Sequence, residues 1–126
     1  MKQPTKWLAA ALITLGLNQA VWADDVSDFR ENLQAAAQGN AAAQFDLGMM
    51  YENGEGVRQD YAEAVRWYRQ AAEQGYARAQ NNLGLMYVIG RGVRQDLALA
   101  QEWYGKACQN GDQNGCDNDQ RLKAGY

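Results

Sequence analysis

Residues 40–75 read NAAAQFDLGMMYENGEGVRQDYAEAVRWYRQAAEQG, and residues 76–111 read YARAQNNLGLMYVIGRGVRQDLALAQEWYGKACQNG. When the two segments are aligned without gaps, 19 of the 36 positions carry the same residue. A match of this extent at a fixed offset marks an internal repeat, and a period of roughly 20–50 residues is typical of solenoids and related arrays. The repeat therefore determines the fold class ahead of any local motif.

Each repeat contains the pattern of two amphipathic helices. In both halves, apolar residues recur at spacings of three and four, which places them on one helical face. The Gly-x-Gly at residues 54–56 separates the halves, because glycine tolerates the positive φ of a helix exit. In the first repeat the apolar positions are Ala43, Leu47, Met50, Tyr51, Ala64, Trp67, Tyr68 and Ala71. Each repeat is therefore expected to form an α/α hairpin.

The start of each second helix carries a capping signal. Asp60 lies at the expected N-cap with Glu63 three residues later, a pair that resembles a capping box. The second repeat has Asp96 at the same position but Leu99 in place of the glutamate. We therefore expect a weaker cap in the second repeat.

Trp67 and Trp103 occupy the same position in the two repeats. Matched positions in successive repeats favour packing between helix layers, where each buried aromatic ring contributes roughly 2–3 kcal/mol. The alternative is a pair of tryptophans that stack on a ligand.

Incomplete repeats flank the two complete ones. The run Ala35-Ala36-Ala37-Gln38-Gly39 matches residues 71–75, so Val26 to Gln38 is expected to be a lone second helix. Residues 112–124 take the position of a lone first helix, although Asp119 stands where the repeats have leucine. A polar terminal helix is typical of a solenoid cap. The sequence thus predicts an all-α chain with two complete hairpins, 40–75 and 76–111, between half-repeats 26–39 and 112–124.

The first 23 residues have the pattern of a cleavable signal peptide. Lys2 and Lys6 precede the mainly apolar stretch Trp7 to Leu17, and small residues suited to a signal peptidase follow at Val21 and Ala23. An apolar stretch of this length is too short for a membrane-spanning helix of about 20 residues. The alternatives are a signal anchor and a buried helix.

Cleavage after residue 23 leaves residues 24–126, with 10 basic and 15 acidic side chains and a net charge of −5. This balance argues against nucleic-acid binding, which requires clustered basic residues. We expect a periplasmic or secreted protein, in a bacterial envelope, with no transmembrane segment after cleavage.

The composition also argues against an enzyme. The chain has no histidine, and its only serine, Ser27, lacks the lysine of an S-x-x-K motif because Arg30 stands three residues later. Asp112, Asp117 and Asp119 do not follow the spacing of a calcium-binding loop. We therefore expect no catalytic residue, no metal ligand and no cofactor.

The repeat resembles the Sel1-like repeat, a family of tetratricopeptide-like α/α hairpins. The shared pattern is A-x-A-Q-x-x-L-G-x-M-Y-x-x-G-x-G-V-x-x-D-x-x-x-A-x-x-W-Y-x-x-A-x-x-x-G, which residues 41–75 and 77–111 both carry. The 36-residue period and the Gly-x-Gly-Val loop distinguish it from the 34-residue tetratricopeptide form. The resemblance implies a right-handed superhelix that acts as a protein-interaction scaffold, and it does not imply enzymatic activity.

The two cysteines extend this resemblance. Cys108 and Cys116 are eight residues apart, similar to the spacing in cysteine-rich secreted members, in which such a pair is a disulfide between neighbouring helices. An even cysteine count in an exported chain suggests the same pairing. A loop this short would add roughly 2.5 kcal/mol of stability if unstrained. The alternative is a pair of reduced thiols.

The concave face of such a superhelix, lined by the first helices, is the candidate binding surface. Outside the shared apolar stripe, the first helices of the two repeats differ. We expect Phe45, Met49, Asn82, Leu85 and Val88 to form a groove with an apolar strip. The alternative is that Phe45 and Leu85 pack against neighbouring helices.

These features favour an exported scaffold that binds a protein or peptide on its concave face. Some cysteine-rich relatives bind or hydrolyse β-lactams, so a protein that binds β-lactams or peptidoglycan fragments is the alternative function. Self-association is a third possibility, because the solenoid is short and its ends could pair.

Overall fold

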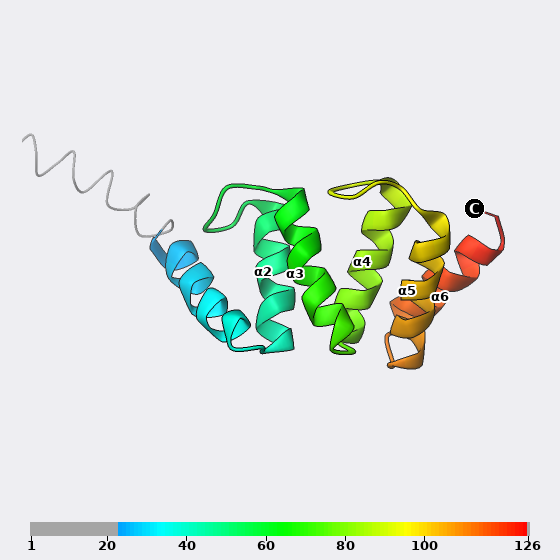
Figure 1. Ribbon diagram of the computed structural model, residues 1–126, viewed down its shortest axis with the longest axis horizontal. Coiled ribbons are helices and arrows are strands. Elements are labelled where there is room, and N and C mark those ends of the chain that lie inside the picture. Colours follow the sequence, from blue (N-terminus) through cyan, green and yellow to red (C-terminus); the bar gives the residue numbers. More distant parts are fainter. Residues whose placement is uncertain (1–22, 126) are drawn as a thin grey trace, which may run out of the picture.

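The computed structural model describes residues 23–125, and the regular secondary structure in this range is entirely helical. Residues 23–37 belong to an N-terminal helix, which precedes the labelled helices in Figure 1. The helices that follow are α2 (Ala41–Asn53), α3 (Tyr61–Glu73), α4 (Ala77–Ile89), α5 (Leu97–Gln109) and α6 (Gln113–Lys123). The predicted all-α solenoid is confirmed, with hairpins α2–α3 and α4–α5 between two single helices. The predicted signal peptide lies, up to residue 22, outside the described residues.

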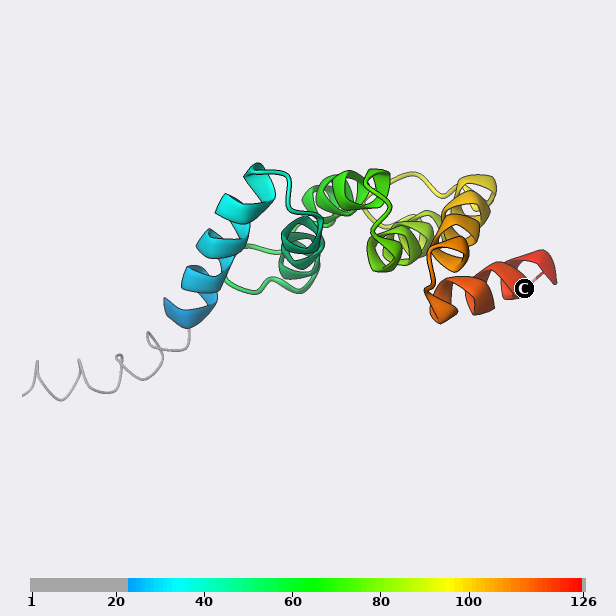
Figure 2. The same cartoon turned by 90° about the horizontal axis from the view of Figure 1, so that it is seen from below.

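The helices form two layers. In Figure 2, α2, α4 and α6 lie along one side of the solenoid and α3 and α5 along the other, while the N-terminal helix runs from the first side to the second. Each labelled helix packs against the next one in the chain, and α6 also contacts α4. The outward side chains of α2, α4 and α6 therefore share one surface, which we call the even-helix face.

A glycine and a tyrosine set the spacing within each hairpin. The ring of Tyr68 in α3 is completely buried against Gly48 in α2, where a Cβ atom would overlap the ring. The second hairpin repeats the arrangement, since a Cβ atom at Gly84 would lie 2.7 Å from Cδ1 of Tyr104. The two helices approach closely because neither glycine has a side chain.

The two tryptophans lie at shallower positions than these tyrosines. Trp67 and Trp103 are both half-buried. Trp67 packs against the buried cluster that joins the N-terminal helix to α2, and Trp103 packs against the central cluster of the solenoid. The tryptophans therefore contact the core as predicted, but Tyr68 and Tyr104 fill the deepest space between the helices of each hairpin.

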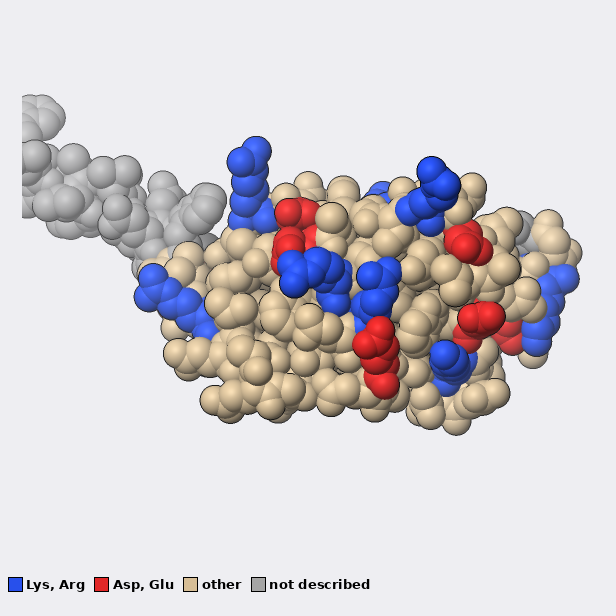
Figure 3. Space-filling view, in the orientation of Figure 1, with Lys and Arg blue, Asp and Glu red and all other residues tan. Residues whose placement is uncertain are grey.

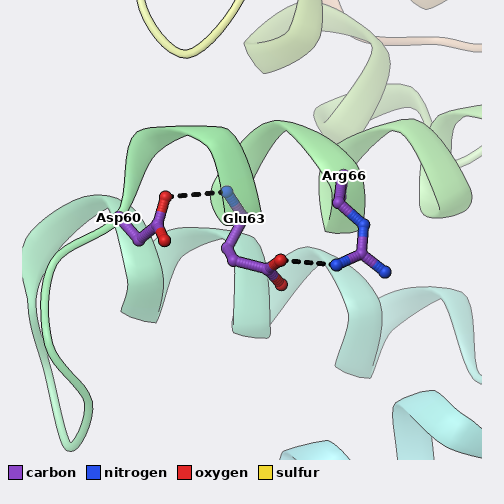
Figure 4. Close-up of polar contacts among 3 residues, drawn as sticks. All are labelled: Asp60, Glu63 and Arg66. Atoms are coloured by element: carbon purple, nitrogen blue, oxygen red, sulfur yellow. Dashed lines mark hydrogen bonds and ion pairs between the residues drawn. The ribbon is translucent and has the colours of Figure 1, made fainter.

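The cap of α3 uses only half of the predicted capping box. A side-chain oxygen of Asp60 accepts a hydrogen bond from the backbone N–H of Glu63 at 3.1 Å. The carboxylate of Glu63 pairs with the guanidinium group of Arg66 and does not reach back to Asp60 (Figure 4). The glutamate side chain therefore contributes an ion pair on the helix surface and does not complete a capping box.

The cap of α5 is consequently as complete as that of α3. Asp96 accepts from the backbone N–H of Leu99 at 3.0 Å. The backbone N–H groups of Asp60 and Asp96, which a capping box would satisfy with a glutamate, donate instead to the carbonyls of Tyr51 and Tyr87. The expectation of a weaker second cap is wrong, because the preceding first helix supplies the acceptor in both repeats.

We predict that Gly48→Ala destabilises the protein by about 1–3 kcal/mol, because the added methyl group overlaps the buried Tyr68 ring. Urea unfolding followed by far-UV circular dichroism, with the disulfide intact, measures the change. Gly105→Ala is the matched control. Position 105 lies within α5 with no atom within 4 Å of the added Cβ, so the exchange should stabilise by up to about 1 kcal/mol. An unchanged urea midpoint for Gly48→Ala would contradict the proposed spacing role.

Candidate functional site

The centre of the even-helix face contains a hollow of about 340 Å³. Three successive first helices contribute to it, with apolar side chains from α2 and polar ones from α4 and the start of α6. The lining residues are Phe45, Met49, Arg78, Asn81, Asn82, Asp112 and Asn114. Three of the five predicted groove residues, Phe45, Met49 and Asn82, therefore border the same hollow.

Phe45 is a core residue that also reaches the edge of the hollow. Its side chain is only 2% exposed, and its ring lies 5.8 Å from the ring of Tyr68 and 5.4 Å from that of Tyr76. The guanidinium carbon of Arg78 lies 4.8 Å from the centroid of the Phe45 ring, so this cation covers the remaining exposed edge. Phe45 thus packs against neighbouring helices, which is the alternative to a groove residue, and Arg78 provides the polar surface that covers it.

A buried tyrosine hydroxyl forms polar contacts beneath the hollow. The Tyr68 hydroxyl donates a hydrogen bond to Oε1 of Glu52 at 2.7 Å and also interacts with the side chain of Asn82. Burial, followed by the bond to Glu52, raises the pKa of Tyr68 far above its usual range. The hydroxyl therefore keeps its proton and links α2, α3 and α4 beneath the surface.

The other two predicted groove residues border a second hollow, of about 70 Å³, near the C-terminal end of the face. Leu85 is 43% exposed and Val88 is half-buried. Leu122 and Asn118 of α6 close the hollow on the other side, above the ring of Tyr104. This hollow brings Leu85 and Val88 together, with Leu85 accessible to solvent rather than packed in the core.

The contribution of α6 to both hollows was not predicted from the sequence. The side-chain amide of Asn118 donates to Oδ1 of Asn81 at 2.9 Å, which fixes α6 beside α4. The 36-residue period contains a signal for this arrangement, because Asn118 is one period after Asn82. The polar cap helix thus forms a wall of the candidate surface as well as the end of the solenoid.

A third hollow, of about 250 Å³, lies at the N-terminal end of the same face, between the N-terminal helix and α2. Within residues 23–125, four carboxylates line it together with Asn32, Met49 and Met50, and no lysine or arginine does. Partial burial raises the pKa of Asp46, and the nearby cation of Arg78 lowers it by a smaller amount. The carboxylates are Asp28, Glu31, Asp46 and Glu55.

Buried glutamines join each hairpin to the helix before it. Nε2 of Gln44 donates to the carbonyl of Ala36 at 3.2 Å, and Nε2 of Gln80 donates to the carbonyl of Ala72 at 3.0 Å. Both glutamines are nearly inaccessible to solvent, at 4% and 3% exposure. In both joints, donor and acceptor residues are eight positions apart.

The disulfide occupies the third joint of the same series. Cys108 and Cys116 are bonded and are also eight residues apart, with Cα atoms separated by 4.4 Å. Cys108 is one period after Ala72, and Cys116 is one period after Gln80. A covalent bond therefore stands where the preceding joints have a hydrogen bond from a buried glutamine.

Ser27, the only serine of the chain and so its only candidate serine nucleophile, is exposed on the N-terminal helix. Within residues 23–125, no group of three or more histidine, cysteine, aspartate or glutamate side chains is placed to hold a metal ion. None of the described helices is both long enough and apolar enough to cross a membrane.

The family model of the Sel1 repeat matches residues 41–76 and 77–112, one residue later than the limits expected from the sequence. No curated protein sequence matches the chain significantly. Among solved structures, the chain is similar to a Sel1 repeat protein from Oxalobacter formigenes, with 41% identity and a TM-score of 0.70. The match covers 72% of this chain and 37% of that one.

Two further structures are similar. One is a protective antigen of uropathogenic Escherichia coli strains that displays an SLR fold, with 33% identity, a TM-score of 0.68, and coverage of 90% of this chain and 27% of that one. The other is cysteine rich protein B of Helicobacter pylori, with 27% identity and a TM-score of 0.69. That match covers 71% of this chain and 67% of that one. The chain thus spans well under half of the length of the first two relatives.

We predict that a glutamine joint can replace the disulfide. Cys108→Ala/Cys116→Gln should unfold at a higher urea concentration than Cys108→Ala/Cys116→Ala. The introduced glutamine can donate its side-chain amide to the backbone carbonyl of residue 108, as Gln80 donates to the carbonyl of Ala72 in the preceding joint. We expect a gain of about 1 kcal/mol, the usual net value of one hydrogen bond. Both variants should be less stable than the oxidised protein, by roughly 1–3 kcal/mol. Equal stability of the two cysteine-free variants would contradict the equivalence of the joints.

Proposed function

Because this chain belongs to the Sel1 repeat family, we propose that it is an exported scaffold that binds a protein or peptide partner on its even-helix face. Sel1 repeat proteins are generally scaffolds for protein interaction. The observation that carries the proposal is the set of three hollows on this one face, with apolar side chains left accessible beside them. Leu85 and Ile89 of α4 are 43% and 46% exposed, which supports a docking surface.

Export is supported by the oxidised cysteine pair, because disulfides persist mainly outside the cytoplasm. In the repeat register Asp24 is one period before Asp60, the N-cap of α3, although Ala23 and Asp24 are themselves helical here. The packing agrees with this register. Gly56 abuts the carbonyl of Asp25, as Gly92 abuts the carbonyl of Tyr61 one period later.

The relatives are consistent with an envelope location. A protective antigen is accessible to the immune system, and one of the similar structures is described as such an antigen. We therefore propose that the protein is periplasmic or secreted, in a bacterial envelope.

The proposal includes no enzymatic activity. Ser27 is the only serine of the chain, and the chain has no histidine to act as its base. The alternative, a protein that binds β-lactams or peptidoglycan fragments, would use the same hollows and requires a direct test.

We predict that Leu85→Asp abolishes capture of the partner without altering the fold. Leu85 borders the apolar hollow and is already accessible, so the charge disrupts the surface rather than the core. Crosslinking in the native envelope, followed by mass spectrometry, identifies the partner and quantifies its loss. The matched control is Leu97→Asp, at a leucine that is 49% exposed at the start of α5, away from the even-helix face.

Far-UV circular dichroism should be the same for both variants and the unmodified protein. Equal capture by Leu85→Asp and Leu97→Asp would refute binding at this face. Titration with penicillin and with muropeptides tests the alternative function, and saturable binding that Leu85→Asp removes would favour it. Sedimentation at several concentrations tests self-association, which would appear as a mass that rises with concentration.

We also predict that the protein recovered from the cell envelope begins at Asp24. Intact-mass measurement or N-terminal sequencing of protein expressed from the full chain tests this. A retained N-terminal segment would indicate a signal anchor and would contradict the proposed processing.

A further inference from the structure

The three hollows form a row along the even-helix face, and we call this row the groove. Met49 borders both the N-terminal hollow and the central one. The hydrogen-bonded pair of Asn118 and Asn81 lies between the central hollow and the apolar hollow, because Asn81 lines the former and Asn118 lines the latter. A ligand that lies along this groove crosses α2, α4 and α6 in turn.

The two ends of the groove differ in chemistry. The apolar end presents Leu85, Val88 and Leu122 around a space of about 70 Å³, which suits one small aliphatic side chain. The opposite end carries the four carboxylates of the N-terminal hollow. None of these four forms an ion pair, since the pairs found among residues 23–125 are Arg66–Glu63 and Lys123–Asp119.

The middle of the groove suits an extended backbone. Asn81, Asn82 and Asn114 line the central hollow. Asn81 already bonds Asn118 and Asn82 interacts with Tyr68, but each amide has two donor hydrogens and two acceptor lone pairs, so further capacity remains. Arg78 and Asp112 line the same hollow with opposite charges, so the centre has no strong preference for either sign. The ends of the groove therefore determine which ligand it selects.

We propose that the groove binds an extended peptide segment that has basic residues at one end and a small aliphatic residue at the other. The proposal rests on the function proposed above and specifies its partner. The two ends lie about two helix spacings apart, roughly 20 Å at 8–10 Å per spacing. About six residues of extended chain, at roughly 3.3 Å each, cover that distance.

Charge complementarity favours this occupant over the others. A second copy of the protein carries a net charge of −5 over residues 24–126, and a nucleic acid carries a phosphate at every nucleotide, so the carboxylates repel both. The opposite face differs, because basic and acidic side chains are interspersed over the α3 and α5 side of the molecule (Figure 3). The excess of negative charge at this end is thus a property of the groove, although Arg78 offsets part of the charge of Asp46.

A nuclear magnetic resonance titration of the ¹⁵N-labelled, disulfide-bonded protein tests the proposal. The probe is a peptide with blocked termini that starts with two lysines, continues with Gly-Ser-Gly-Ser-Gly and ends with leucine, together with its reversed sequence. At least one of the two should shift the amide signals of Asp46, Asn82 and Leu85 and leave those of α3 unchanged. Exchange of both lysines for glutamates, or of the leucine for asparagine, should weaken binding by about tenfold or more.

A charge exchange in the protein provides the matched comparison. Glu31→Lys should weaken binding of the lysine peptide and strengthen binding of the glutamate peptide, because Glu31 lines the negative end. Glu102→Lys, at an exposed glutamate of α5, makes the same change in net charge away from the groove and should alter neither affinity.

Two results would overturn the proposal: equal affinity for the lysine and glutamate peptides, or no binding of any peptide. If Leu85→Asp still abolishes partner capture in either case, the partner binds the even-helix face by other chemistry and only this inference fails. If Leu85→Asp captures the partner normally, the proposed function itself fails.

Discussion

The structure depends on the joint at which each first helix meets the end of the preceding second helix. At that joint a buried glutamine amide donates to a carbonyl near the end of the earlier helix, as Gln44 does to Ala36. Its side-chain oxygen is occupied as well, since Oε1 of Gln44 accepts from Nε2 of Gln74 at 2.8 Å. A buried amide left without partners costs about 1–3 kcal/mol, so both bonds must form together. One side chain therefore ties three successive helix ends and fixes the angle at which repeats stack.

The same constraint explains why the last joint is covalent. Among the residues of α6, only Gly115 is buried, and it packs so closely on α5 that a Cβ there would lie 2.5 Å from the Cβ of Ala107. The helix has little apolar surface to hold it against α5, and no later helix among the described residues packs on its outer side, so a glutamine bond alone would hold it less firmly than a covalent bond. The disulfide between Cys108 and Cys116 supplies the missing attachment. It also positions the wall that α6 contributes to the central and apolar hollows.

Much of the fold was predictable because each helix carries its own periodicity and breaks. The spacing of apolar residues predicted both hairpins, and Gly54 and Gly90 end α2 and α4 with positive φ values of 69° and 67°. The cap of α5 was mispredicted, since the acceptor for Asp96 N–H is a backbone carbonyl of Tyr87 and leaves no trace in the side-chain pattern. Local rules describe the bonds made within a helix and miss those supplied by its neighbour.

The candidate surface was predictable only in part, for a related reason. Phe45 and Leu85 are both apolar residues of first helices outside the shared stripe, yet one is 2% exposed and the other 43%. The difference arises because Tyr68 and Tyr76 lie against Phe45, whereas α6 leaves Leu85 open beside Leu122.

The sequence by itself determined the repeat, its period, the helices and the spacing of the cysteines, all of which are properties of residues close together in the chain or separated by one period. Only the tertiary structure decided which side chains remain accessible, how the three hollows are arranged, and that carboxylates of the N-terminal helix, of α2 and of the loop after α2 meet in one place. These features depend on contacts between different helices, and packing angles rather than local pattern determine such contacts.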